Sequence, residues 1–195
     1  MALKLVTAPT TYPVTLAEAK LHCRVDGTDD DALITALITS ATEMCEQQTG
    51  RALMTQTWLL TLDEFPTEIE LTRVPVQSIS SVTYTDTAGA TQTLSTGSNW
   101  RLLDLGDFSM ARIVPVYGYT WPATRAQNNV VSVQYVAGYA SAAAVPESIK
   151  QWIKLMVSTM YENRETEAYS SRAVSTTVQM QFVDRLLDRY RVFDL

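Results

Sequence analysis

The hydrophobic positions of residues 29–50 predict one long amphipathic helix. Apolar side chains recur with a period near 3.6 residues, and threonine and glutamate side chains face the other way. The acidic run Asp29–Asp31 supplies an N-cap and negative charge at the positive end of the helix dipole, and Gly50 is the residue expected just after the helix. The apolar stripe consists of Leu33, Ile34, Leu37, Ile38, Ala41, Met44 and Cys45.

A second stripe of equal length lies about a hundred residues downstream, in residues 146–162. Pro146 or Glu147 stands where the first helical turn should begin. Because a single stripe cannot fold alone, we expect the two helices to pack antiparallel as a helical hairpin or bundle. The predicted contact joins Leu33, Leu37, Ala41 and Met44 to Trp152, Ile153, Met156 and Met160.

Between the two stripes the period changes to two, which predicts β-strands. The predicted fold class is therefore α+β, with a small antiparallel β lobe inserted into a helical core and followed by a C-terminal arm. The predicted divisions are 1–55 and 141–163 for the helical core, 56–140 for the β lobe and 164–195 for the arm. Residues 1–14 are predicted to be extended, and Thr15 and Glu18 form a capping box that opens a short helix through His22. The strands are predicted at 56–63, 69–71, 76–84, 91–94, 100–103, 111–114 and 130–136.

The arm combines a polar run, residues 164–179, with a predicted short helix at 182–191. A polar spacer before an aromatic, arginine-bearing end is typical of a docking arm that orders on a partner. The alternative is that Leu186, Leu187 and Tyr190 fold back on the protein's own helices. The candidate subunit or portal contacts are Leu155, Arg185, Arg189, Tyr190, Arg191 and Phe193.

The composition argues against several functional classes. A net charge of −6 and a pI near 4.8 disfavour general nucleic-acid binding. No apolar run is long enough to cross a membrane, and the N-terminus lacks a signal-peptide core, so we expect synthesis in the cytoplasm. The nucleophile-elbow, phosphate-loop and dinucleotide motifs are absent, which predicts a non-enzymatic protein without a cofactor.

Metal binding also has little support in the sequence. His22 is the single histidine, so a histidine-rich zinc site cannot form within one chain. Asp26 with the acidic run Asp29–Asp31 could suggest a calcium loop, but the spacing around Gly27 favours helix capping. Cys23 and Cys45 are interpreted as buried free thiols.

Tryptophan residues offer a second kind of candidate contact. Trp58 and Trp152 lie in register with apolar faces and are predicted to be core residues. Trp100 and Trp121 stand beside Asn99 and Pro122 and are the candidates for exposed contacts.

Several stretches, taken together, resemble the head–tail connector (adaptor) family of long-tailed bacteriophages and gene transfer agents. The resemblance spans about residues 9–165 and is weakest in the tail. Its main pieces are Pro13–Lys20 running into Arg24–Asp26, Asp29–Asp31, Thr49–Leu53, Gln56–Trp58, Pro75–Tyr84, Ala137–Tyr139, Val145–Lys150 and Tyr161–Glu165.

This resemblance implies a structural virion protein of the neck. Its subunits would form a ring, taken as twelve copies, beneath the portal protein, and would join the DNA-filled head to a stopper or tail-terminator protein. Twelve chains would carry on the order of −70 charges, and an acidic lumen would let DNA slide through without sequence-specific binding. Two alternatives remain: a carbohydrate- or protein-binding β module of a tail-associated adhesin, with a pocket at Trp100 and Trp121, and an enzyme with an unrecognised site.

Overall fold

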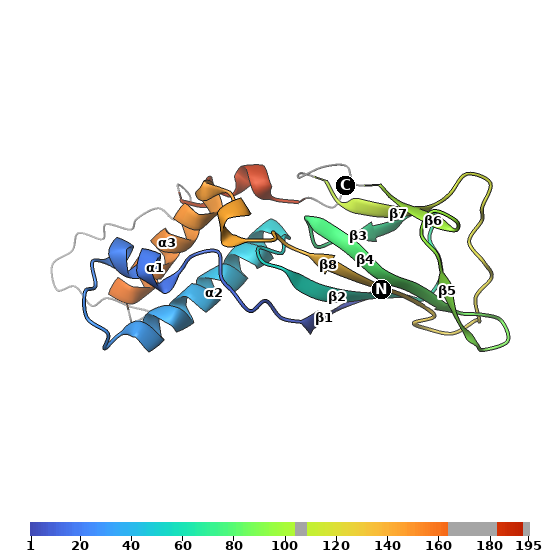
Figure 1. The fold of residues 1–195 in the computed structure, drawn as a ribbon, viewed down its shortest axis with the longest axis horizontal. Helices are drawn as coiled ribbons and strands as arrows, with labels where there is room; N and C mark the ends of the chain where they lie inside the picture. The colour runs from blue at the N-terminus through green and yellow to red at the C-terminus, as the bar shows by residue number, and fades with distance from the viewer. Residues whose placement is uncertain (104–108, 164–182, 193–195) are drawn as a thin grey trace, which may run out of the picture. The chain divides into compact units, whose positions relative to one another are not determined.

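The computed structural model describes residues 1–103, 109–163 and 183–192, and the chain divides into two compact units (Figure 1). The β unit comprises Met1–Thr10, Gly50–Ala140 and Val192–Leu195. The helical unit comprises Thr11–Thr49 and Ser141–Arg191. Helices and antiparallel sheets are both present, so the predicted α+β class is confirmed.

The β unit contains two antiparallel sheets. The larger has the strand order β1-β2-β8-β4-β5, and the smaller has the order β3-β7-β6. Strand β8 alternates strictly between buried and half-buried residues, as expected of a strand whose one face covers a core. Leu60, Val133 and Tyr135 are fully enclosed there. The strands are β1 Ala2–Thr7, β2 Gln56–Leu62, β3 Ile69–Leu71, β4 Val76–Thr85, β5 Thr91–Leu94, β6 Trp100–Leu103, β7 Ala111–Pro115 and β8 Val131–Ala137.

Strand β1 lies in a segment that the sequence analysis described only as extended. It pairs antiparallel with β2 at the edge of the larger sheet, with Leu3 opposite Leu60. Residues 1–10 therefore lie in the β unit, whereas the sequence analysis grouped them with the helical core. The reason is physical: every β1 residue except Leu3 is exposed, so the strand carries no periodic pattern of burial.

The helical unit consists of α1 (Leu16–Cys23), α2 (Asp31–Thr49) and α3 (Glu147–Glu162), with short 3₁₀ turns at Ala142–Ala144 and Asp188–Tyr190. Helix α2 packs against α3, and α1 contacts both (Figure 1). The Tyr161 hydroxyl, near the end of α3, donates to Asp30, just before α2. Gly50 follows α2 with φ of +71°, the left-handed conformation predicted for this position.

The packing face of α2 differs from the predicted one. Ile34, Ile38 and Cys45 are almost completely buried, whereas Leu33 and Met44 are 36% and 37% exposed. The predicted contact through Leu33 and Met44 is therefore wrong. The apolar residues of α2 span a wider arc than the neighbouring helices cover, so one side of the stripe is buried and the other is not. On α3, the predicted residues Trp152, Ile153 and Met156 are buried, and Met160 is half-buried.

The described part of the arm, residues 183–192, follows the fold-back alternative up to Arg191. Leu187 is completely buried, and the Trp152 indole N–H of α3 donates to the Asp184 carboxylate at 3.1 Å. Within the described residues, helical backbone at 183–184 gives way to turn residues at 185–187 and to the 3₁₀ turn at Asp188–Tyr190, so the predicted helix does not continue regularly to Arg191. The polar run 164–179 lies outside the described residues.

Candidate interaction surface

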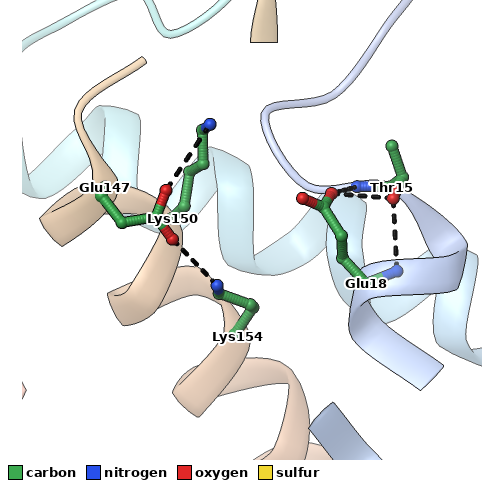
Figure 2. A network of polar contacts seen from close by, with 5 residues as sticks. All are labelled: Thr15, Glu18, Glu147, Lys150 and Lys154. Atoms are coloured by element: carbon green, nitrogen blue, oxygen red, sulfur yellow. Dashed lines mark hydrogen bonds and ion pairs between the residues drawn. The ribbon is translucent and has the colours of Figure 1, made fainter. Parts of the chain in front are cut away.

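A polar network fixes the start of α1 (Figure 2). The Thr15 hydroxyl accepts the Glu18 backbone N–H at 3.2 Å, and the Glu18 carboxylate accepts the Thr15 backbone N–H at 2.7 Å. This is the capping box predicted from the sequence. The Thr15 hydroxyl also donates to the Glu18 carboxylate at 2.7 Å. The hydrogen bonds that this carboxylate accepts from the Thr15 backbone N–H and hydroxyl hold the pKa of Glu18 below its usual value, and the positive charges of Lys150 and Lys154 on α3 lower it further.

The two lysines also bind Glu147 on their own helix. Lys150 and Lys154 approach the Glu147 carboxylate at 3.7 and 3.1 Å (Figure 2). At the other end of α1, Lys20 forms an ion pair with Asp31 at the start of α2. The Lys20–Asp31 ion pair thus joins α1 to α2, whereas the capping box and the Glu147 ion pairs each lie within or at the start of a single helix.

The outer side of α1 borders an open groove of about 540 Å³, here called the α1 groove. Leu21, at its edge, is 82% exposed, which is unusual for a leucine on a well-capped helix. Ala19, on the inner side of the same helix, is fully buried. The residues lining the α1 groove are Leu16, Ala17, Lys20, Leu21, Val25 and Asp26.

The uncovered side of α2 forms a second apolar strip. Residues 32–42 contain no charged side chain at all. The uncovered residues follow Leu33 by three, four, seven and eleven positions and so share one face of the helix. We call this set the outer stripe of α2: Leu33, Ala36, Leu37, Ser40 and Met44, of which Leu37 is half-buried and the others are exposed.

The candidate tryptophans do not form a shared surface pocket. Trp100 is 6% exposed, and its indole N–H donates to the Leu94 carbonyl at 3.1 Å, so its assignment as a contact residue was wrong. Trp100 begins β6, and its large ring fills the core of the β unit. Trp121 is half-buried and stacks on Phe65 at 4.8 Å between ring centroids. The predicted adhesin pocket therefore lacks one of its two defining residues.

The predicted contact residues of α3 and the arm lie in different surroundings. Leu155 is half-buried on α3, and Arg185 and Arg189 are exposed. Tyr190 is half-buried, and Arg191 lies 3.7 Å from Asp188 in an ion pair. Phe193 is outside the described residues. The role of these residues as contacts stays a prediction.

Among the described residues, the titratable groups with a large pKa shift are Cys45 and Tyr135. Burial raises the pKa of Cys45 to about 12, as it does for the phenol of Tyr135. Such shifts keep both groups protonated, which is typical of core residues and not of nucleophiles. Within residues 1–103, 109–163 and 183–192, no three histidine, cysteine or acidic residues gather in a way that could hold a metal ion. In the same ranges, every helix is too short or too polar to cross a membrane.

The outer stripe and Leu21 were not recognised as candidate contacts from the sequence. The charge-free run at 32–42 was a usable signal, because exposed helix faces normally carry charged residues. Leu21 had no comparable signal, since a short helix with weak apolar periodicity does not indicate which of its leucines is covered.

The chain was compared with known protein families, protein sequences and solved structures. Residues 13–96, which include α1, α2 and strands β2 to β5, match the family model of the Phage gp6-like head-tail connector protein. No curated protein sequence shows significant similarity to the chain.

Three solved structures share the fold over the whole chain. A chain from the neck of an empty gene transfer agent (GTA) particle, computed with C6 symmetry, has a TM-score of 0.79 and 23% identity. A chain from the virion of a native GTA particle has a TM-score of 0.76 and 26% identity. One from the neck of a native GTA particle, computed with C12 symmetry, has a TM-score of 0.77 and 23% identity. Each match covers 100% of this chain and 97% of the other. The resemblance to head–tail connector proteins inferred from the sequence is confirmed.

Proposed function

We propose that this protein is a head–tail connector in the neck of a phage or phage-like particle, a structural protein and not an enzyme. The observation that carries the proposal is the extent of the similarity. Both units, and not a single motif, correspond to a chain of a GTA virion at a TM-score of 0.76 and 26% identity. The match of residues 13–96 to a connector family supports the same role independently of the three-dimensional comparison.

In this proposal, copies of the chain form a ring of twelve below the portal protein and above a stopper or tail-terminator protein. The C6 and C12 symmetry of the similar necks supports a ring of that kind. The chain would be made in the cytoplasm of the bacterial host and retained in the virion. No cofactor is part of the proposed role.

The charge of the chain fits a DNA conduit. Twelve copies at −6 each would carry on the order of −70 charges, and acidic groups facing the lumen would repel DNA phosphates. DNA would then pass through the ring without sequence-specific binding.

The proposal is tested by particles that lack this protein. We expect them to contain filled heads and separate tails, because the piece between them is missing. Adding the purified chain to those heads should restore complete particles, as seen by electron microscopy. Normal attachment of tails without the chain would refute the connector function.

A further inference from the structure

We propose that the outer stripe of α2 in one copy of the chain docks into the α1 groove of the next copy in a ring. This inference rests on the proposed function, because it assigns a contact surface to a protein already placed in a neck. The connector function does not specify which surfaces of the helical unit join neighbouring subunits, and this inference names them.

The outer stripe has the composition of an interface centre. Large apolar residues stand at both ends, Leu33 and Met44, and small Ala36 and Ser40 lie between them. Interface centres are depleted in charged residues, and α2 carries none between Asp31 and Glu43. The other exposed flank of the same helix carries Thr35, and the exposed Glu43, seven residues after Ala36 and three after Ser40, marks the border of the stripe. The helix therefore has one apolar and one polar exposed flank. Only the polar flank has the composition usual for a helix face in contact with solvent.

A ring contact requires a different surface on the partner. In a cyclic assembly with more than two copies, each contact joins one patch to another patch and not to itself. Among the described residues of the helical unit, the large hydrophobic side chains with substantial exposure are Leu21, Leu33 and Met44. Two of them lie on the outer stripe and the third borders the α1 groove, so the unit offers one apolar strip and one apolar recess.

The α1 groove is compatible with an uncharged partner surface, because the lysine that lines it is already paired within the same chain. Lys20 already forms an ion pair with Asp31 at 2.5 Å, and its side chain is 16% exposed. The other lining residues are the apolar Leu16, Ala17, Leu21 and Val25 and the solvent-exposed Asp26. A charge-free strip can enter without opposing a buried charge, and the small residues Ala36 and Ser40 allow close approach of two helices.

The first test places charges on the outer stripe. The variant Leu33→Glu/Met44→Glu should fold as an isolated chain with a melting temperature close to that of the wild type, because both positions are over a third exposed in the free subunit. Its assembly into rings on portal-bearing heads should fall at least tenfold, measured by particle counts in electron micrographs. The matched control Thr35→Glu/Thr39→Glu adds the same charge to the polar flank and should assemble like the wild type.

The second test identifies the partner surface. A chain with Cys23→Ser, Leu21→Cys and Ala36→Cys should form disulfide-linked dimers and larger multiples when assembled and oxidised. Either single cysteine variant in the same background should not form that ladder. Rings that assemble normally but give no ladder would show that the outer stripe meets another surface, which overturns the proposed pairing.

The remaining outcomes separate the two proposals. If the wild type forms rings and Leu33→Glu/Met44→Glu forms them equally well, the docking inference is wrong and the connector function stands. If the variant lowers the melting temperature of the free chain, the outer stripe is covered within one copy, which also rejects the inference. If wild-type chains are absent from necks, the connector function itself fails.

Discussion

The inner and outer sides of α2 have nearly the same apolar composition and opposite surroundings. Ile34, Ile38 and Cys45 are enclosed within the helical unit, whereas Leu33 and Met44 are over a third exposed. Helix α1 repeats the contrast at a smaller scale, with Ala19 buried and Leu21 exposed. Periodicity shows that a helix has an apolar side, but it does not show how much of that side one chain covers. The surplus apolar side is where a second chain is expected.

The largest effect expected on the inner side is at Trp152. Its ring is fully buried, and its indole N–H is bonded to Asp184. Trp152→Ala should lower the free energy of unfolding by about 3–5 kcal/mol, because it leaves a cavity and frees the Asp184 carboxylate. Chemical denaturation of the purified chain measures this. An unchanged unfolding free energy would mean that α3 does not present Trp152 to the core.

A matched pair on α2 tests the contrast between its two sides. Ile38→Ala should cost about 2–5 kcal/mol, because Ile38 is 2% exposed. Leu33→Ala should cost no more than about 1 kcal/mol, because over a third of the Leu33 side chain is already exposed. Equal losses at the two positions in the isolated chain would contradict the described packing of α2.

Substitution of the capping box measures how much it stabilises α1, the helix that borders the α1 groove. Thr15→Ala should cost about 1 kcal/mol at neutral pH. The Glu18 pKa is lowered in the folded chain, so the contribution of this carboxylate is present above its unfolded value of 4.5 and is lost as the pH falls through its folded value. The difference between wild type and Thr15→Ala should therefore shrink in acid, as followed by thermal unfolding across pH. A difference that grows in acid would contradict the capping role.

The reactivity of the two cysteine thiols reports the difference between buried and partly exposed positions without any substitution. Burial raises the pKa of Cys45 to about 12, and it raises the pKa of the half-buried Cys23 by less. In the native chain at pH 8, a thiol reagent should modify Cys23 slowly and leave Cys45 unmodified until unfolding. Mass spectrometry of the labelled peptides shows which of the two cysteines is modified first. Modification of Cys45 ahead of Cys23 would contradict the enclosed inner side of α2.

The sequence predicted most of the regular elements because their signals are local. The capping box, Gly50 and the alternating strands were identified from neighbouring residues, and the structure has them at nearly the predicted bounds. Strand β1 was missed because its pairing partner, β2, lies some fifty residues away and its own residues are exposed. Trp100 was misassigned because the turn residues beside it do not reveal that its ring points into the β core.

The surfaces were harder to predict than the elements. Leu33 and Met44 fit the apolar period of α2 as well as Ile34 and Ile38 do, and the choice between them depends on where α1 and α3 pack. The arm was equally ambiguous, because the same apolar residues fit docking on a partner or folding back. The burial of Leu187 places residues 183–191 in the second class.

Solvent access at the outer stripe, before and after assembly, tests the central claim most directly. In a Cys23→Ser background, Leu33→Cys and the control Thr35→Cys can each be labelled with a thiol reagent in the free chain and in assembled particles. We predict rapid labelling of both in the free chain, and at least tenfold protection of Leu33→Cys alone in particles. Equal labelling of Leu33→Cys in the two states would contradict the account.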